Sequence, residues 1–139
     1  MAGYSGSPLP KKLGLAPGMR VCAIGFDSYA TLVGASGLDL ALQAKPDSTT
    51  NLVHLFATRR RELEAWLPKL RRALRPDATL WVSWPKKAAK ADTDIVEGTI
   101  REVALPLGFV DVKVCAVDEV WSGLKLVVRK QLRGSARTR

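Results

Sequence analysis

Histidine, cysteine and long apolar runs are scarce in this sequence, and each scarcity argues against a class of function. His54 is the only histidine, so no histidine pair or triad is available to hold a metal. Cys22 and Cys115 are the only cysteines, and each lies in an apolar run, which predicts two buried free thiols in a reducing compartment. No apolar run approaches the roughly 20 residues that span a bilayer, and the N-terminal residues resemble no signal peptide. We therefore expect a cytoplasmic protein without a metal site or a membrane partner.

Motifs that identify a reaction are also missing. The sequence contains neither a Gly-x-Ser-x-Gly nucleophile elbow nor a glycine loop of the Walker type. His54 stands in the apolar run 52–57, where it predicts a hydrogen-bonded core residue. The four tryptophans are expected mainly to pack in the core: Trp66, Trp81, Trp84 and Trp121. The sequence thus predicts no catalytic residue and favours a protein that is not an enzyme.

Acidic side chains are outnumbered, and the formal net charge is +9. Part of this excess lies at the C-terminus, where the last eleven residues contain five basic side chains and no acid. We expect residues 131–139 to form a flexible basic tail that keeps the protein soluble, with contacts to phosphates as the alternative. A second basic stripe follows the segment 58–75, which we interpret as a solvated helix face or as an anion-binding face.

A length of 139 residues fits one domain with one core. Residues 1–18 are rich in proline and glycine and are expected to be irregular, with at most one or two helical turns, and residues 19–130 to form the domain. Helices are predicted over 28–33, 58–75 (with a kink or break near Trp66 caused by Pro68) and 94–105, where Asp94 and Glu97 resemble a capping box. Apolar runs predict strands over 19–25, 38–44, 52–57, 79–84, 110–117 and 124–129.

Strands that alternate with helices and are apolar on both faces predict a parallel sheet covered by helices on each side. The last two strands are joined by residues 118–123 alone, so they must form an antiparallel hairpin. The expected fold class is therefore α/β, with three layers and a mixed sheet of about six strands, mostly parallel, that ends in this hairpin.

Ligands of open α/β sheets bind outside the carboxyl ends of the parallel strands. Residues 25–29, 57–60, 84–87 and 118–123 are expected at this edge, and loops 84–87 and 118–123 should meet there. The candidate ligand-binding residues are Arg59, Lys86, Lys87, Asp118, Glu119 and Trp121, with Asp27 nearby. Their cations suit a phosphate or carboxylate, and the alternative is simple ion pairing of the two lysines with Asp118 or Glu119.

Two segments resemble landmarks of S-adenosylmethionine-dependent methyltransferases. Residues 15–25 (LAPGMRVCAIG) resemble the lead-in and first strand of that fold, and residues 70–82 (LRRALRPDATLWV) resemble its central helix, turn and strand. The resemblance implies a reduced Rossmann-like fold and a cofactor site after the first strand. At that place the sequence has only one glycine, Gly25, followed by the bulky Phe26 and Tyr29, whereas a nucleotide cofactor needs two or three glycines. We therefore predict that S-adenosylmethionine binds weakly or not at all and assign no cofactor.

A further resemblance is to a family of small bacterial proteins, domain-of-unknown-function family 3052. It rests on residues 4–6 (YSG), 8–9 (PL), 11–14 (KKLG), 84–87 (WPKK) and 115–125 (CAVDEVWSGLK). The resemblance spans nearly the whole chain and implies no activity.

Three functions remain open at this point. The leading hypothesis is a non-catalytic, methyltransferase-like binding module for a small anionic ligand or another protein. The first alternative is an enzyme, namely a reduced methyltransferase that still holds its cofactor. The second alternative is non-specific nucleic-acid association through the basic tail and the arginine-rich helix.

Overall fold

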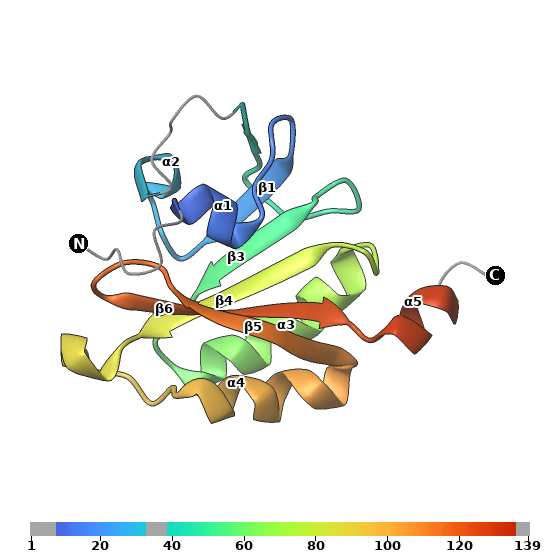
Figure 1. The fold of residues 1–139 in the computed structure, drawn as a ribbon. Coiled ribbons are helices and arrows are strands. Elements are labelled where there is room, and N and C mark those ends of the chain that lie inside the picture. Colours follow the sequence, from blue (N-terminus) through green and yellow to red (C-terminus); the bar gives the residue numbers. More distant parts are fainter. Residues whose placement is uncertain (1–7, 33–38, 136–139) are drawn as a thin grey trace.

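The computed structural model describes residues 8–32 and 39–135 of the chain. Within these residues six strands form one sheet in the order β2-β1-β3-β4-β6-β5 (Figure 1). Strands β1, β2, β3 and β4 run parallel to one another, and β6 is antiparallel to both β4 and β5. This arrangement confirms the predicted mixed sheet and its C-terminal hairpin. The strands are β1 (Arg20–Ile24), β2 (Ala41–Leu42), β3 (Leu52–Phe56), β4 (Thr79–Pro85), β5 (Phe109–Ala116) and β6 (Trp121–Val128).

Helices lie on both faces of this sheet. In Figure 1, α1 and α2 lie beside β1 and β3, whereas α3 and α4 cover the opposite face. The helices are α1 (Leu9–Leu13), α2 (Tyr29–Leu32), α3 (Arg60–Ala73), α4 (Glu97–Ala104) and α5 (Lys130–Ser135), with 3-10 turns η2 (Lys87–Ala89) and η3 (Leu105–Leu107). Helix α5 lies in the segment for which we expected a flexible tail, and its Leu132 packs against the larger core.

The larger core lies between the sheet and helices α3 and α4. Leu63, Leu67 and Leu70 recur at helical spacing along α3, and all three are fully buried against the sheet. The helix continues through Pro68, so the predicted break is wrong. Leu67 and Leu70 remain in the core on either side of the proline, and this apolar packing outweighs the loss of one backbone hydrogen bond.

The start of α4 corrects a second prediction. Asp94 and Glu97 do not form a capping box, because α4 begins only at Glu97 and the N–H of Val96 donates to Thr99 Oγ1 (3.1 Å). The Asp94 carboxylate instead accepts the backbone N–H of Arg60 at the start of α3 (2.7 Å). Asp94 therefore ties the loop before α4 to the first turn of α3.

A smaller core lies on the other face, under α1 and α2. Helix α1 is a short helical turn within the segment that we expected to be irregular, and its Leu13 is only 1% exposed. The indole N–H of the buried Trp81 donates to the carbonyl oxygen of Leu13 (3.0 Å). This bond fixes α1 over the centre of the sheet.

Candidate functional site

The topological switch point of the sheet lies between β1 and β3. From β1 the chain continues to β2 on one side, while from β3 it continues to β4 on the other. A crevice opens at the carboxyl ends of two such strands, and open α/β proteins bind their ligands there. The residues that follow β1 and β3 therefore decide whether a ligand has room.

Gly25 ends β1 at this crevice, and its conformation is dictated by contact with β3. Its φ of +84° lies in the left-handed region that favours glycine. A Cβ atom built on Gly25 would lie 2.4 Å from the carbonyl oxygen of Phe56. Gly25 is thus required because the backbone of β3 approaches it closely, and not because a ligand does.

Aromatic side chains from three elements occupy the crevice. The ring of Phe26 stacks on that of Phe56 with centroids 4.6 Å apart, and Trp121 of the hairpin meets Phe56 edge-on at 5.1 Å. Phe26 and Trp121 also contact each other edge-on at 6.4 Å. These separations are those of packed aromatic pairs. The sequence predicted the bulk of Phe26 here but missed Phe56, because nothing in an apolar strand indicates which residue faces a crevice.

A buried hydrogen-bond chain lies beneath this aromatic cluster. His54 is fully buried, with its Nδ1 2.8 Å from the Tyr29 hydroxyl and its Nε2 2.7 Å from Ser83 Oγ. Burial lowers the pKa of His54 to about 3 and raises that of Tyr29. The predicted core histidine is confirmed, with a neutral ring. At most 3% of each of the three side chains is exposed, so this chain positions α2 on the sheet and does not meet solvent.

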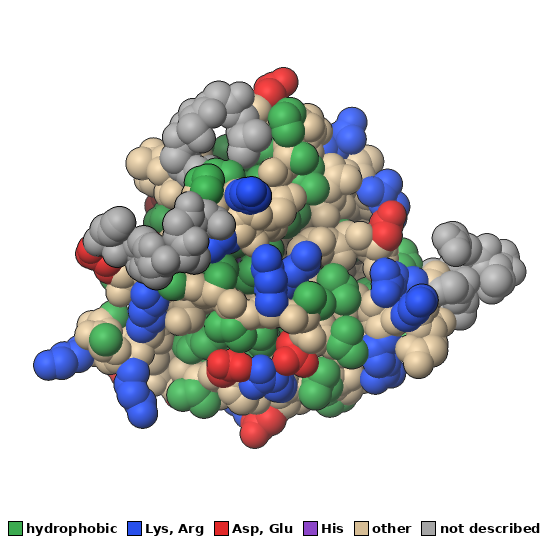
Figure 2. Space-filling model, viewed as in Figure 1, with side chains coloured by type: hydrophobic (Ala, Val, Ile, Leu, Met, Phe, Trp, Pro, Cys, Tyr) green, Lys and Arg blue, Asp and Glu red, His purple; other side chains and the backbone are tan. Residues whose placement is uncertain are grey.

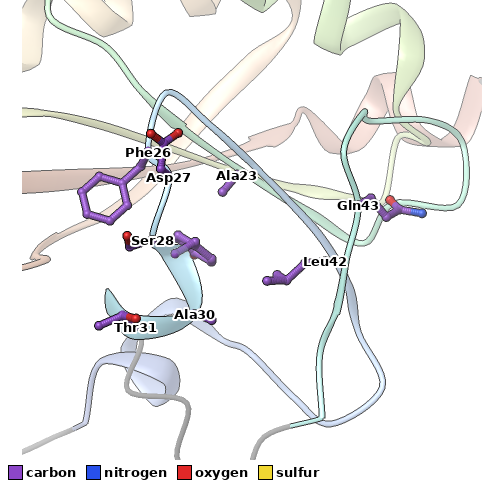
Figure 3. Close-up of a pocket in the computed structure, with 9 residues that line it drawn as sticks. Ala23, Phe26, Asp27, Ser28, Ala30, Thr31, Leu42 and Gln43 are labelled. Carbon is purple, nitrogen blue, oxygen red and sulfur yellow. The ribbon is translucent and has the colours of Figure 1, made fainter.

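A cavity of about 440 Å³ lies beside the crevice, between the end of β1, helix α2 and β2 (Figure 3). Its polar lining comes from Asp27, Ser28 and Thr31 on one side and Gln43 on the other. The Gln43 amide is already engaged, since its Nε2 donates to Thr49 Oγ1 (3.0 Å) and its Oε1 accepts the Thr50 hydroxyl (2.5 Å). Among the described residues that line this cavity, Asp27 is the one that carries a carboxylate.

The residues of the crevice and cavity do not match what a nucleoside cofactor needs. A bound nucleoside requires free space over the turn after β1 and an acidic residue after the second strand for the ribose hydroxyls. Phe26 packs on Phe56 at that turn, and β2 is followed by Gln43, whose amide is tied to Thr49 and Thr50. The position after β2 therefore offers no acidic partner for the ribose of such a cofactor.

The predicted meeting of loop 84–87 and hairpin 118–123 is confirmed. Pro85 pairs with Trp121 at the end of the β4–β6 ladder, and the N–H of Lys86 donates to the carbonyl oxygen of Val120 (2.7 Å). Lys87 is exposed in the 3-10 turn that follows. The same turn contains Lys90, exposed and with a φ of +55°, which sequence analysis did not include.

Three of the predicted site residues have other partners. Arg59 forms an ion pair with Asp92 (2.6 Å) on the side of α4. The Asp118 carboxylate accepts the backbone N–H groups of Val120 and Trp121 (2.8 and 2.7 Å), which shapes the hairpin turn. Trp121 packs into the aromatic cluster, so it covers the sheet edge as the alternative interpretation expected.

The predicted ion pairing of the hairpin edge is wrong. Among residues 8–32 and 39–135, none of the ion pairs joins Lys86 or Lys87 to Asp118 or Glu119. Asp118 instead holds its own turn, through the two backbone bonds that its Oδ1 accepts. Lys86 and Lys87 thus remain as neighbouring cations on a loop whose backbone is fixed by the hairpin.

The described residues offer neither a cluster of metal ligands nor a membrane-spanning helix. They contain no group of three or more histidine, cysteine, aspartate or glutamate side chains that could hold a metal ion. None of their helices is both long and apolar enough to cross a bilayer.

Comparison with known proteins identifies the fold. No family model and no curated protein matches the sequence, so the resemblance to the family of unknown function is unsupported. The structure is similar to a SAM-dependent methyltransferase from Aquifex aeolicus (TM-score 0.60, 18% identity, 87% of this chain and 88% of that one). It is also similar to the tRNA methyltransferase TrmK of B. subtilis (TM-score 0.57, 14% identity, 98% of this chain and 70% of that one). The chain therefore has the methyltransferase-like Rossmann fold.

Proposed function

We propose that this chain is a non-catalytic binding module built on the methyltransferase-like fold, and that it binds a small anion at the hairpin edge. The observation that carries the proposal is the aromatic cluster of Phe26, Phe56 and Trp121, which takes up the crevice where an enzyme of this fold needs its cofactor. His54 is not available as a general acid or base, because it is sealed beneath the cluster with both ring nitrogens bonded.

Lys86 and Lys87 support an anion as the ligand. Their loop is fixed by the Lys86 to Val120 backbone bond, so two ammonium groups are presented from a constrained backbone. A positioned pair of cations binds phosphate or carboxylate through charge-assisted hydrogen bonds. No described carboxylate forms an ion pair with either lysine, so their charges are available to a ligand.

A reduced methyltransferase is the second candidate function, and one observation favours it. The cavity beside α2 has a volume of about 440 Å³, and it presents the carboxylate of Asp27 with the hydroxyls of Ser28 and Thr31. These groups suit an amine or a hydroxyl of a small ligand. A ligand that enters there would lie against the side chain of Phe26.

Calorimetry with S-adenosylmethionine separates the two candidates. We expect no measurable heat with the native chain. We also expect none with Phe26→Ala, because Gly25 remains in contact with Phe56 and the turn 25–29 has no second glycine. A dissociation constant in the low micromolar range for the native chain would overturn the non-catalytic proposal.

The anion site has its own experiment, a thermal-shift titration with pyrophosphate and with citrate. A ligand that binds only the folded state raises its stability by about 2.7 kcal/mol at a hundred times the dissociation constant. We expect Lys86→Ala/Lys87→Ala to abolish the shift and Arg61→Ala/Arg72→Ala, which removes two exposed cations from α3, to preserve it. Equal shifts in both variants would show that the hairpin edge is not the site.

A further inference from the structure

Two lysines stand directly opposite each other on neighbouring strands. In the β5–β6 ladder Lys113 pairs with Lys125, and Lys125 in turn lies opposite Trp81 of β4. Because the Trp81 indole is bonded to Leu13 of α1, this row belongs to the face of the sheet that carries α1. Cβ atoms of such a pair are about 4.5–5.5 Å apart, and like charges placed there are destabilising.

This repulsive pair has no acidic neighbour to relieve it. In the part of the chain that the structure describes, neither Lys113 nor Lys125 takes part in an ion pair. Lys113 is exposed and Lys125 half-buried. A local conflict that the rest of the fold does not relieve is typical of a functional site.

A third lysine reaches the same surface from α1. The Lys12 ammonium donates to the carbonyl oxygen of Ala116 at the end of β5 (3.1 Å). Cys115 lies between the lysines: burial raises the pKa of its thiol, and the nearby charges of Lys12 and Lys113 oppose that rise. We call the surface formed by Lys12, Lys113 and Lys125 the lysine face. Figure 2 shows basic side chains near the centre of this view and others along its left and right sides, with acidic ones below the centre and at the upper, left and right margins.

Two arginines on the opposite side of the sheet are ion-paired. Arg60 of α3 pairs with Glu64 and with Glu102 of α4, and Arg101 of α4 pairs with Glu97 and Asp111. These pairs tie α3 to α4 and α4 to β5. Arg61 and Arg72 of α3 are exposed and take part in none of the described ion pairs, so they form the matched comparison for Lys113 and Lys125.

We propose that the lysine face binds the phosphate backbone of duplex nucleic acid without reading its sequence. Lysines from α1, β5 and β6 place three positive charges on one surface, which suits the negatively charged phosphates of a duplex. The row offers no exposed aromatic ring to stack unpaired bases, since its only aromatic residue, Trp81, is fully buried.

An extended acidic peptide fits this surface less well. Such a peptide would add to the free edge of β5, but the register of that strand shifts between Asp111 and Lys113. A β-bulge of this kind interrupts the regular row of backbone groups that an added strand needs. The surface lies on the face of the sheet and not at the hairpin edge, so the inference does not depend on the small-anion site at Lys86 and Lys87.

The test is fluorescence anisotropy of a labelled duplex, RNA or DNA, titrated with the full chain over a series of salt concentrations. We expect Lys113→Gln/Lys125→Gln to reduce the salt slope by about 1.8, at about 0.9 for each lost phosphate contact, and to weaken binding at low salt at least about tenfold. Arg61→Gln/Arg72→Gln removes the same charge from α3 and should change neither value. Lys86→Gln/Lys87→Gln should also retain duplex binding while losing the small-anion site.

Three outcomes would overturn the inference. The first is an unchanged slope in Lys113→Gln/Lys125→Gln, which would assign duplex binding to the basic C-terminal segment. The second is competition by polyglutamate as strong as that by duplex at equal charge, which would indicate an acidic protein partner. The third is a loss of binding that accompanies unfolding. We expect the melting temperature of this variant to be equal to or above that of the native chain, because the substitutions remove a repulsive pair.

Cys115 provides an independent readout in the native chain. It is half-buried within the lysine face, whereas Cys22 is fully buried in the other core. Bound duplex should slow the alkylation of Cys115 several-fold, and raising the salt concentration should restore the rate. An alkylation rate that does not change at saturating duplex would show that the nucleic acid binds elsewhere.

Discussion

A Cβ atom on Gly25 would lie 2.4 Å from the carbonyl oxygen of Phe56, so the end of β1 and the end of β3 touch without an intervening ligand. Gly25→Ala combines this contact with a φ of +84°. The left-handed conformation alone costs an L-residue about 1–2 kcal/mol, and the contact forces β1 and β3 apart in addition. We therefore expect the free energy of unfolding, measured in urea, to fall by at least that amount.

Gly98 is the matched control for this substitution. It lies in α4, and a Cβ atom built on it would meet nothing within 4 Å. Alanine there should raise the free energy of unfolding by up to about 1 kcal/mol, because it reduces the conformational freedom of the unfolded chain. Equal effects of the two substitutions would contradict the close contact between β1 and β3.

The hydrogen bond from the Trp81 indole to the Leu13 carbonyl oxygen should hold α1 on the sheet. Trp81→Phe removes the indole donor and leaves the buried Leu13 carbonyl without it, at a cost of about 1–3 kcal/mol. We expect α1 to detach from the sheet before the rest of the chain unfolds. The backbone amide of Leu15, which donates to the carbonyl oxygen of Pro10, should therefore exchange its hydrogen faster. Trp84→Phe changes volume similarly in the other core and should leave this amide protected.

The two cysteines should differ in reactivity and should not pair. Strands β1 and β5 are four strand spacings apart, about 19 Å at roughly 4.8 Å each, and a disulfide needs Cα atoms within about 7 Å. Cys115 is only half-buried, which corrects the prediction of two buried thiols. Its strand β5 lies at the edge of the sheet and pairs with β6 alone. Ellman's reagent should titrate Cys115 slowly in the folded chain and Cys22 only after unfolding. A disulfide between them in an intact mass would contradict the strand order.

Sequence patterns predicted the helices and strands whose buried side chains recur at the spacing of a helix or a strand. The spacing of Leu63, Leu67 and Leu70 is enough to place α3, and the apolar runs are enough to place β3 and β4. A helix buried along one stripe and a strand buried on both faces each leave a pattern in neighbouring residues of the sequence. The meeting of the hairpin with loop 84–87 also followed from strand direction alone. In contrast, β2 contains only Ala41 and Leu42, far fewer residues than the predicted run 38–44, of which residue 38 lies outside the described residues.

Interactions between distant segments escaped the sequence analysis. Asp94 was assigned to its own helix, but its carboxylate binds the backbone of Arg60, 34 residues earlier. The pairing of His54 with Ser83 needs the register of β3 against β4, which no local pattern contains. The role of Asp118 could have been predicted from the sequence. Aspartate in a turn often accepts the backbone N–H two residues ahead, and this preference argues against an ion pair with Lys86.

The buried His54 predicts a pH dependence of stability. Its pKa is about 3 in the folded chain, because burial penalises the charged ring, against 6.5 when unperturbed. Below about pH 6.5 the unfolded chain binds a proton that the folded chain does not take up until about pH 3. The free energy of unfolding should therefore fall as the pH falls through this window, by about 1.4 kcal/mol per pH unit once the unfolded histidine is charged.

Urea denaturation between pH 7.5 and pH 5 should show a loss of about 2 kcal/mol from this group. The range stays above pH 5 because carboxyls with lowered pKa values, those of Asp47 and Asp111, lose their stabilising contacts only at lower pH. His54→Gln is destabilised by the loss of its two hydrogen bonds, so slopes and not absolute values are compared. The variant has no ionisable group at this position, and its stability should be nearly level over the same range. A native slope no steeper than that of His54→Gln would mean that the ring titrates in the folded chain, and with it that the chain from Tyr29 to Ser83 is open to water.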